Sequence, residues 1–167
     1  MKKLLSSLVL AGMMATGALA QDIWPVEISF LDWIYRPSDV AGLRLAIPYG
    51  VNDSVTGVDI GLWGKSDYAW AFQFNVLHNK VRDRMGGLQV SCLNDAGDLT
   101  GMQVGLWNMA ATAEGFQIGL LNLTDQMDGL QIGIINRTEI MHGYQIGLVN
   151  VIRESPVPFA PIINFCF

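Results

Sequence analysis

The sequence predicts an all-β fold built from a tandem repeat. Five units of eight residues begin at residues 87, 101, 115, 129 and 143, so the period is constant at 14 residues. Within each unit the apolar residues recur at every second position, which is the periodicity of a β-strand. Four of the five units also contain two glycines, a composition that is unfavourable in a helix. A fixed period of this kind indicates a repeat architecture.

The first element in chain order is a predicted signal peptide at residues 1–20. Residues 1–3 supply a positive start, residues 4–15 are mostly apolar, and residues 17–20 end the segment with small residues in an A-x-A pattern. This is the anatomy of a secretory signal peptide. The apolar run is shorter than the ~20 residues of a membrane-spanning helix. We therefore expect export, with residues 21–167 forming a single β-repeat domain.

The segment before the regular units predicts a first strand and three weaker copies of the repeat. Residues 27–35 are rich in aromatic and β-branched residues, as strands are. The weaker copies begin at residues 42, 57 and 71. In the first two copies, Arg44 and Asp59 occupy the place that glutamine holds later. They should lie on neighbouring strands, where each neutralises the charge of the other.

The regular units, residues 87–150, contain two recurring polar positions. The third residue is always glutamine: Gln89, Gln103, Gln117, Gln131 and Gln145. The eighth is always asparagine: Asn94, Asn108, Asn122, Asn136 and Asn150. Between units lie short, mostly polar segments, which we interpret as turns. A final strand at 157–167 carries Phe165 and Phe167 at alternating positions, similar to the C-terminal strand signal of outer-membrane barrels, and brings the expected total to about ten strands.

The two faces of the strands leave two architectures open. One face carries Leu and Ile, the other carries Gly, Gln, Gly and a further apolar residue, and neither face is charged in the regular units. An antiparallel β-barrel would place one face against lipid and the other in a narrow lumen, with Arg44 and Asp59 as a lumen ion pair. A β-solenoid suits the fixed period better and would align the asparagines in a ladder, but we expect it to expose the Gly–Gln face. The uncharged faces favour the barrel over the solenoid.

The repeat Gly-x-Gln-(Ile/Val)-Gly-(Leu/Ile)-x-Asn resembles that of the leptospiral-type surface repeat proteins, a group of exported bacterial proteins. Residues 42–50 and 158–167 also resemble parts of that pattern, so the resemblance covers nearly all of the mature chain. It implies a location in the outer membrane or at the cell surface of a Gram-negative-type bacterium, and it implies no reaction. Asn75 and Ser91 replace the second glycine of the repeat, so these two strands should be less regular.

Composition and motifs argue against an enzyme and against nucleic acid as a partner. The net charge is −5, which does not suit a polyanion. The chain has no nucleophile elbow, P-loop or zinc signature, and His78 and His142 lack metal-ligand partners at useful spacing. We therefore predict no catalytic residue, no cofactor and no metal. Cys92 and Cys166 are compatible with a disulfide in an oxidising compartment and equally with two buried thiols.

The expected function is accordingly that of a non-enzymatic exported envelope protein with the outer membrane as its partner. In the barrel architecture its role would be structural or that of a narrow pore. The alternative is a secreted or surface-exposed β-solenoid that binds a partner through its Gly–Gln face. The sequence does not identify a ligand or a protein partner for either architecture.

Overall fold

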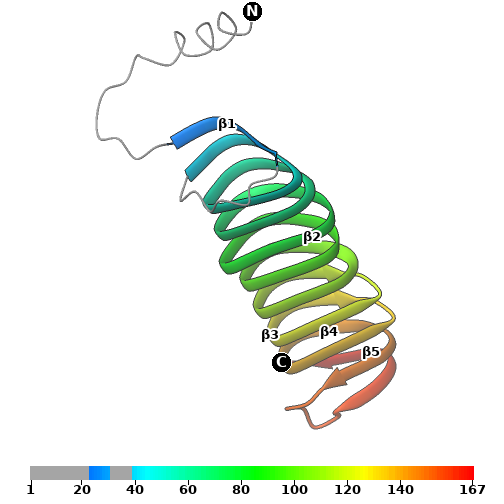
Figure 1. Cartoon of the computed structure of the whole chain (residues 1–167). Helices are drawn as coiled ribbons and strands as arrows, with labels where there is room; N and C mark the ends of the chain where they lie inside the picture. Colours follow the sequence, from blue (N-terminus) through cyan, green and yellow to red (C-terminus); the bar gives the residue numbers. More distant parts are fainter. Residues whose placement is uncertain (1–22, 31–38) are drawn as a thin grey trace, which may run out of the picture.

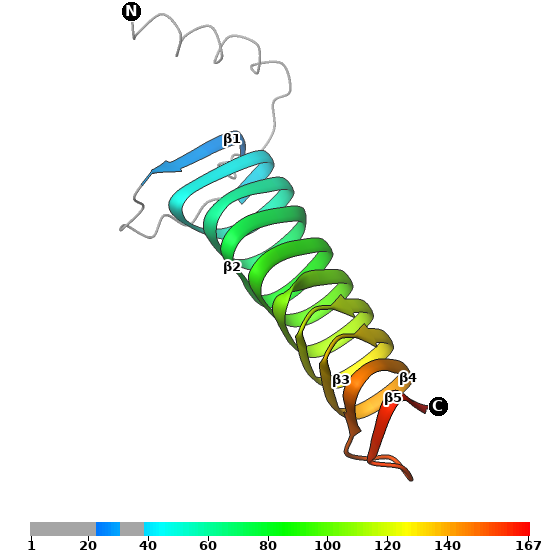
Figure 2. The ribbon, with the colours of Figure 1, turned by 90° about the vertical axis from the view of Figure 1, so that its right-hand side faces the viewer.

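The chain winds into a stack of flattened coils, which Figures 1 and 2 show from two directions. The computed structural model describes residues 23–30 and 39–167. Eight successive coils begin at residues 42, 57, 71, 87, 101, 115, 129 and 143. The fold is a β-solenoid, so the prediction of an all-β tandem-repeat protein is confirmed. The predicted signal peptide lies outside the described residues, as does the end of the predicted strand at 27–35.

Almost the whole described chain is extended backbone that hydrogen-bonds to the neighbouring coil. The strands are β1 Ile23–Phe30, β2 Asp39–Ile118, β3 Leu121–Ile132, β4 Ile135–Ile152 and β5 Phe159–Cys166. β2 is 80 residues long because it continues around successive coils without interruption. The described part therefore forms one five-stranded sheet in chain order, and not the expected row of about ten separate strands.

The prediction of an antiparallel barrel is wrong. β1 pairs with β2, β2 with β3 and β3 with β4 in parallel, and only β5 pairs antiparallel, with β4. In the parallel pairs the same residue type faces itself, so that Gln131 lies between Gln117 and Gln145. The period of 14 residues is thus one complete circuit. It returns the chain to the same position in the next coil, one strand spacing of ~4.8 Å further along the stack.

The interior of the coils contains the glutamines and asparagines, and the Leu–Ile face points outward. All five glutamines and all five asparagines of the regular units are fully buried, whereas Leu106, Leu120 and Leu148 are at least half exposed. The expectation that a solenoid would expose its Gly–Gln face is therefore wrong. The interior amides lie next to glycines, and a Cβ at Gly133 would lie 2.7 Å from the side-chain amide of Asn122.

Seven of the eight coils begin with a glycine that forms a sharp bend close to the preceding coil, and the coil that begins at Ala71 is the exception. Gly143 has φ = 142°, a conformation that side chains with a Cβ rarely adopt. A Cβ at Gly143 would lie 1.9 Å from the carbonyl oxygen of Gly129 in the coil before. The recurring glycine is therefore required both by backbone conformation and by the close stacking of coils.

The segments between units, interpreted as turns, form the second side of each coil. Their residues alternate between interior and surface: Thr138 and Met141 are buried, and Arg137 is exposed. Equivalent small or apolar residues are buried in the other coils, among them Ala96, Leu99, Ala110, Ala113, Thr124 and Met127. These residues pack against the glutamine side of the coil and complete the core.

The coil that contains Asn75 is longer than the regular ones, whereas the coil that contains Ser91 has the regular length, and β2 runs without interruption through both. The longer coil extends from residue 71 to residue 86, and both Asn75 and Ser91 are buried. At the far end of the stack, β5 lies across β4 as an antiparallel cap, visible at the red end of the chain in Figure 1. Within the described residues no helix is long and apolar enough to cross a membrane.

Candidate functional site: an amide interior and an apolar surface

The buried glutamines form a continuous hydrogen-bonded column along the stack. Each Nε2 donates to the Oε1 of the glutamine one coil earlier, as in Gln117 to Gln103 at 2.9 Å and Gln131 to Gln117 at 2.7 Å. The same bond links Gln89 to Gln73, Gln103 to Gln89, and Gln145 to Gln131. The Thr124 and Thr138 hydroxyls, from the second side of the coil, donate to the glutamine oxygens. These bonds satisfy amides that would otherwise destabilise the interior.

The asparagines form a second column. Asn108 Nδ2 donates to Asn122 Oδ1 at 2.8 Å and to the Ile118 carbonyl at 2.9 Å. Asn94, Asn122 and Asn136 repeat both bonds, and Asn150 ends the column with bonds to two carbonyls. The close approach of these amides explains the second glycine of the repeat, since a Cβ at Gly133 would lie 2.7 Å from Asn122 Nδ2. The two columns occupy the space that the barrel architecture assigned to a lumen, so these residues do not line a pore.

Replacing Gln117 by Leu should destabilise the fold more than replacing Gln145 by Leu. Gln117 has partners on both sides, and its loss leaves Gln103 Oε1 and the Thr124 hydroxyl without their bonds to it. Each buried group left unpaired costs about 1–3 kcal/mol. Gln145 ends the column, its Oε1 has no partner, and Gln131 Oε1 keeps the bond from Thr138 when Gln145 is replaced. Urea unfolding of both variants measures the difference, and equal losses would contradict a continuous column.

A buried ion pair extends the glutamine column toward the first coil. Arg44 Nη2 lies 2.5 Å from Asp59 Oδ2, Arg44 Nε lies 2.8 Å from Asp59 Oδ1, and both side chains are fully buried. Arg44 also donates to Asn52 Oδ1, and Asp59 accepts bonds from Gln73 and Asn75. The structure thus brings together the two residues expected to pair. They lie in the interior of adjacent coils and contact no open lumen.

The outward positions of the coils form a continuous uncharged surface, which we call the apolar surface. It consists of positions two, four, six and seven of each unit, counted from the first glycine. In the eight coils from residue 42 to residue 150 no Asp, Glu, Lys or Arg occupies any of these positions. Its large exposed members are Ile47, Ile60, Leu62, Trp63, Phe72, Phe74, Val76, Leu77, Leu93, Leu106, Trp107, Phe116, Ile118, Leu120, Ile132, Ile134, Ile135, Tyr144, Ile146 and Leu148.

The apolar surface is larger than soluble monomers usually expose. Most of its large side chains are between 37% and 67% exposed. With whole aromatic side chains covering ~150–250 Å², the exposed apolar area is on the order of 1,500 Å². The largest apolar patch on an ordinary monomer is roughly 300–600 Å², and larger ones mark interaction sites. The apolar surface is therefore the strongest candidate for a functional site in the described part of the chain.

The second side of the coils carries the charges. Ion pairs link neighbouring coils there: Arg82 with Asp67 at 3.3 Å, Arg153 with Glu139 at 3.1 Å, and Lys80 with Asp95. These side chains are partly exposed, so each pair contributes little to stability. Burial lowers the pKa of His78, whose ring is tilted by 49° against that of Trp63, with centroids 5.3 Å apart, where the two sides meet.

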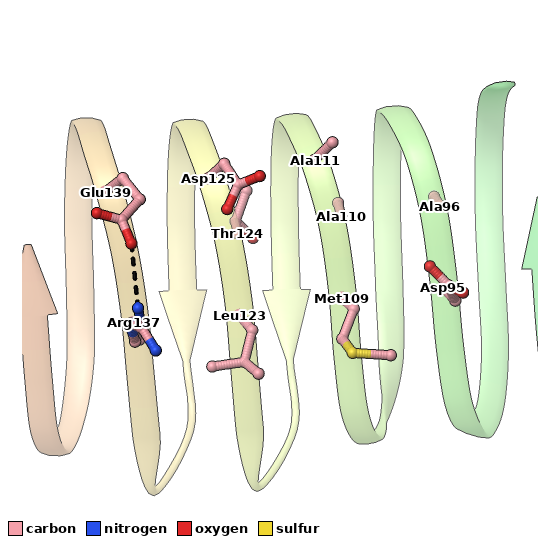
Figure 3. Close-up of a pocket in the computed structure, with 10 residues that line it drawn as sticks. All are labelled: Asp95, Ala96, Met109, Ala110, Ala111, Leu123, Thr124, Asp125, Arg137 and Glu139. Atoms are coloured by element: carbon pink, nitrogen blue, oxygen red, sulfur yellow. Dashed lines mark hydrogen bonds and ion pairs between the residues drawn. The ribbon is translucent and has the colours of Figure 1, made fainter. Parts of the chain in front are cut away.

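A shallow depression of about 360 Å³ lies on the charged side, and Figure 3 shows its lining. Its lining includes Ala110, which belongs to the core, and the exposed Ala111. Asp95 on its wall pairs with Lys80, and Glu139 pairs with Arg137 along the dashed line of Figure 3. These carboxylates already hold basic partners. Among the described residues no group of three side chains is placed to hold a metal ion.

The two cysteines lie on different coils, and the C-terminal phenylalanines lie at the end of the stack. Both thiols are free: Cys92 lies on the coil that begins at residue 87, and Cys166 pairs opposite Gly143 in β5. A disulfide between them is therefore absent. Phe165 and Phe167 pack around Tyr144, with ring centroids 6.1 and 5.2 Å away, and so they belong to the cap of the stack.

Comparisons of the chain with protein-family models, with curated proteins and with solved structures find no match. The resemblance to the leptospiral-type surface repeat proteins therefore remains a prediction. What the chain does has to be inferred from its own residues.

Proposed function

We propose that this protein is an exported, non-enzymatic protein of the bacterial envelope that binds an apolar partner through the apolar surface. The observation that carries the proposal is the absence of any charge from four outward positions in eight consecutive coils. The interior glutamines and asparagines, and the buried Arg44 and Asp59, hydrogen-bond to one another away from solvent, and the lack of a nucleophile elbow, P-loop or zinc signature in the sequence supports a non-enzymatic role. Export rests on the pattern of residues 1–20 and on the resemblance of the repeat to surface proteins.

The interior columns suit a binding role because they make the scaffold rigid. Each coil is fixed to the next by backbone bonds and by two amide columns, so the outward side chains keep a constant spacing. A preorganised surface loses little conformational entropy on binding. Binding then depends on apolar area and shape, with no need for directed polar contacts.

Export and surface binding are tested together by fractionating the native host. The chain should occur in the envelope fraction with residues 1–20 removed, as N-terminal sequencing would show. The purified processed chain should be retained on a phenyl-substituted matrix, and Leu120→Asp should reduce that retention. A full-length chain in the cytoplasm would contradict export, and equal retention of the wild type and Leu120→Asp would contradict binding through the apolar surface.

A further inference from the structure

The backbone beneath the apolar surface is hydrogen-bonded even where the strands are interrupted. At the bends after β2 and β3, the Leu120 N–H donates to the Leu106 carbonyl at 3.0 Å and the Ile134 N–H donates to the Leu120 carbonyl at 3.0 Å. Gly119 and Gly133 likewise donate to carbonyls of the next coil. Unpaired backbone groups cost several kcal/mol each in hydrocarbon. This surface can therefore leave water without leaving these backbone groups unpaired.

The tryptophans of the described residues lie along the two long borders of the apolar surface. Trp63 and Trp107 occupy position seven, at one border, and both are 43% exposed. Trp70 directly precedes the first position of the coil that begins at residue 71, at the other border, and is 67% exposed. Trp24 lies in β1 next to Pro25, whose carbonyl approaches Gly42, and is 52% exposed. The central positions four and six hold aliphatic residues, phenylalanine, one cysteine and no tryptophan.

This distribution matches the boundary between hydrocarbon and water. The indole ring has an apolar body and one N–H donor, and tryptophan is enriched where a membrane protein leaves the acyl region. Beyond the borders the charged positions begin. Examples are Lys65, two residues after Trp63, and Asp67, three residues before Trp70. In the coil from residue 57 to residue 70, which has a tryptophan at both borders, the order is thus apolar residues, tryptophan and then charge, as expected for a protein that lies at a lipid surface.

We propose that the partner of the apolar surface is the hydrocarbon layer of a lipid bilayer. The stack lies along the bilayer with positions two, four and six among the acyl chains, the tryptophans at the boundary and the charged side in water. This inference rests on the proposed function and names its partner. Because the chain carries a net charge of −5, attachment relies on apolar contact and does not require anionic lipids.

Flotation with phosphatidylcholine vesicles tests the inference on the purified processed chain. We expect the wild type to float with the vesicles, and Ile132→Asp to bind at least about tenfold more weakly, because it places a carboxylate among acyl chains. The matched control is Ile140→Asp, in the same coil but on the charged side, which should bind like the wild type. Leu148→Asp, at a more exposed position, should repeat the loss. Circular dichroism and thermal unfolding establish that the variants are folded.

Quenching by brominated lipids tests the orientation. Bromine near the headgroup should quench tryptophan emission more than bromine at the ends of the acyl chains. The result that overturns the inference is a folded wild type that does not float. If that protein instead forms a dimer that Ile132→Asp dissociates, a second copy is the partner and the proposed function stands. If it neither floats nor self-associates and Ile132→Asp behaves like the wild type, the proposed function fails as well.

Discussion

Deleting residues 115–128 should leave a folded, shorter solenoid, whereas deleting residues 115–121 should prevent the following coils from stacking. The first deletion removes one complete circuit. Gly129 then follows Glu114 directly and takes the place of Gly115 against Gly101. Gln131 can bond to Gln103 as Gln117 did, and both amide columns close again. In a stack of repeats, stability is roughly a sum over units and their interfaces, so the loss is partial.

The deletion of seven residues removes only one side of a coil. The chain would arrive at the end of the charged side at Glu114 and would have to continue at Asn122, the start of the next charged side. No residues remain to cross the coil, and every later residue is displaced by half a circuit. Thr124 would then occupy the glutamine position, and the columns that join the coils would be interrupted.

Circular dichroism and urea unfolding distinguish the two outcomes. The shortened protein without residues 115–128 should unfold cooperatively with a slightly smaller dependence on urea, because this slope scales with the surface exposed on unfolding. The protein without residues 115–121 should show a loss of β-signal or aggregation. Comparable stability of the two proteins would be incompatible with a circuit of 14 residues.

The repeat was predictable because its signal is local and periodic. Alternation within a unit such as residues 129–136 identifies extended backbone, and the constant spacing of glycines identifies a repeated element of one size. The ion pair was predictable on the same basis, because Arg44 and Asp59 hold the same position in consecutive copies. Any architecture that places consecutive copies side by side brings these two residues together.

Which face points inward was not predictable from alternation. Residues Gln131 and Ile132 alternate equally well in a barrel and in a solenoid. The expectation that a solenoid would bury its Leu–Ile face left it with an uncharged outer Gly–Gln face, and this favoured the barrel. The deciding factor is the space inside the coil, where Asn122 and Asn136 pass so close to Gly133 that no Cβ fits. The hydrogen bonding within the glutamine column depends on tertiary structure, because each side-chain amide bonds to a partner 14 residues away.

The second side of the coil was missed although the sequence contains a signal for it. Segments such as residues 137–142 resemble turns because they are short and polar. However, position 10 of the unit is always small or apolar in the regular coils, as at Ala110 and Thr138, and position 13 is apolar in all but the last of them, as at Met127 and Met141. This recurrence, three residues apart, indicates a second buried column and thus a complete circuit. A second buried column favours the solenoid, with the Leu–Ile face as its outer surface.

Asp59→Gln should destabilise the protein by about 3–5 kcal/mol, the usual cost of leaving one member of a buried ion pair without its partner. The Arg44 guanidinium would keep Asn52 and the Lys65 carbonyl as acceptors but would lose both oxygens of the carboxylate. Arg44→Gln should also be strongly destabilising, because the Asp59 carboxylate would remain buried with only the amides of Gln73 and Asn75 as donors. Urea unfolding of each variant measures these losses.

The double variant Arg44→Gln/Asp59→Gln tests whether the two single losses come from breaking the ion pair or from changing each position independently. It introduces the residue of the regular coils at both positions, so that the new amide at position 59 can donate to the one at position 44 and accept from Gln73, as the later glutamines do. Buried ion pairs replaced by matched neutral residues often cost little, so the double variant should be far more stable than the sum of the single losses implies. The coupling energy of this cycle reports the pairing directly. Additive losses would mean that the two residues stabilise the fold independently, in contradiction to their contact in the interior.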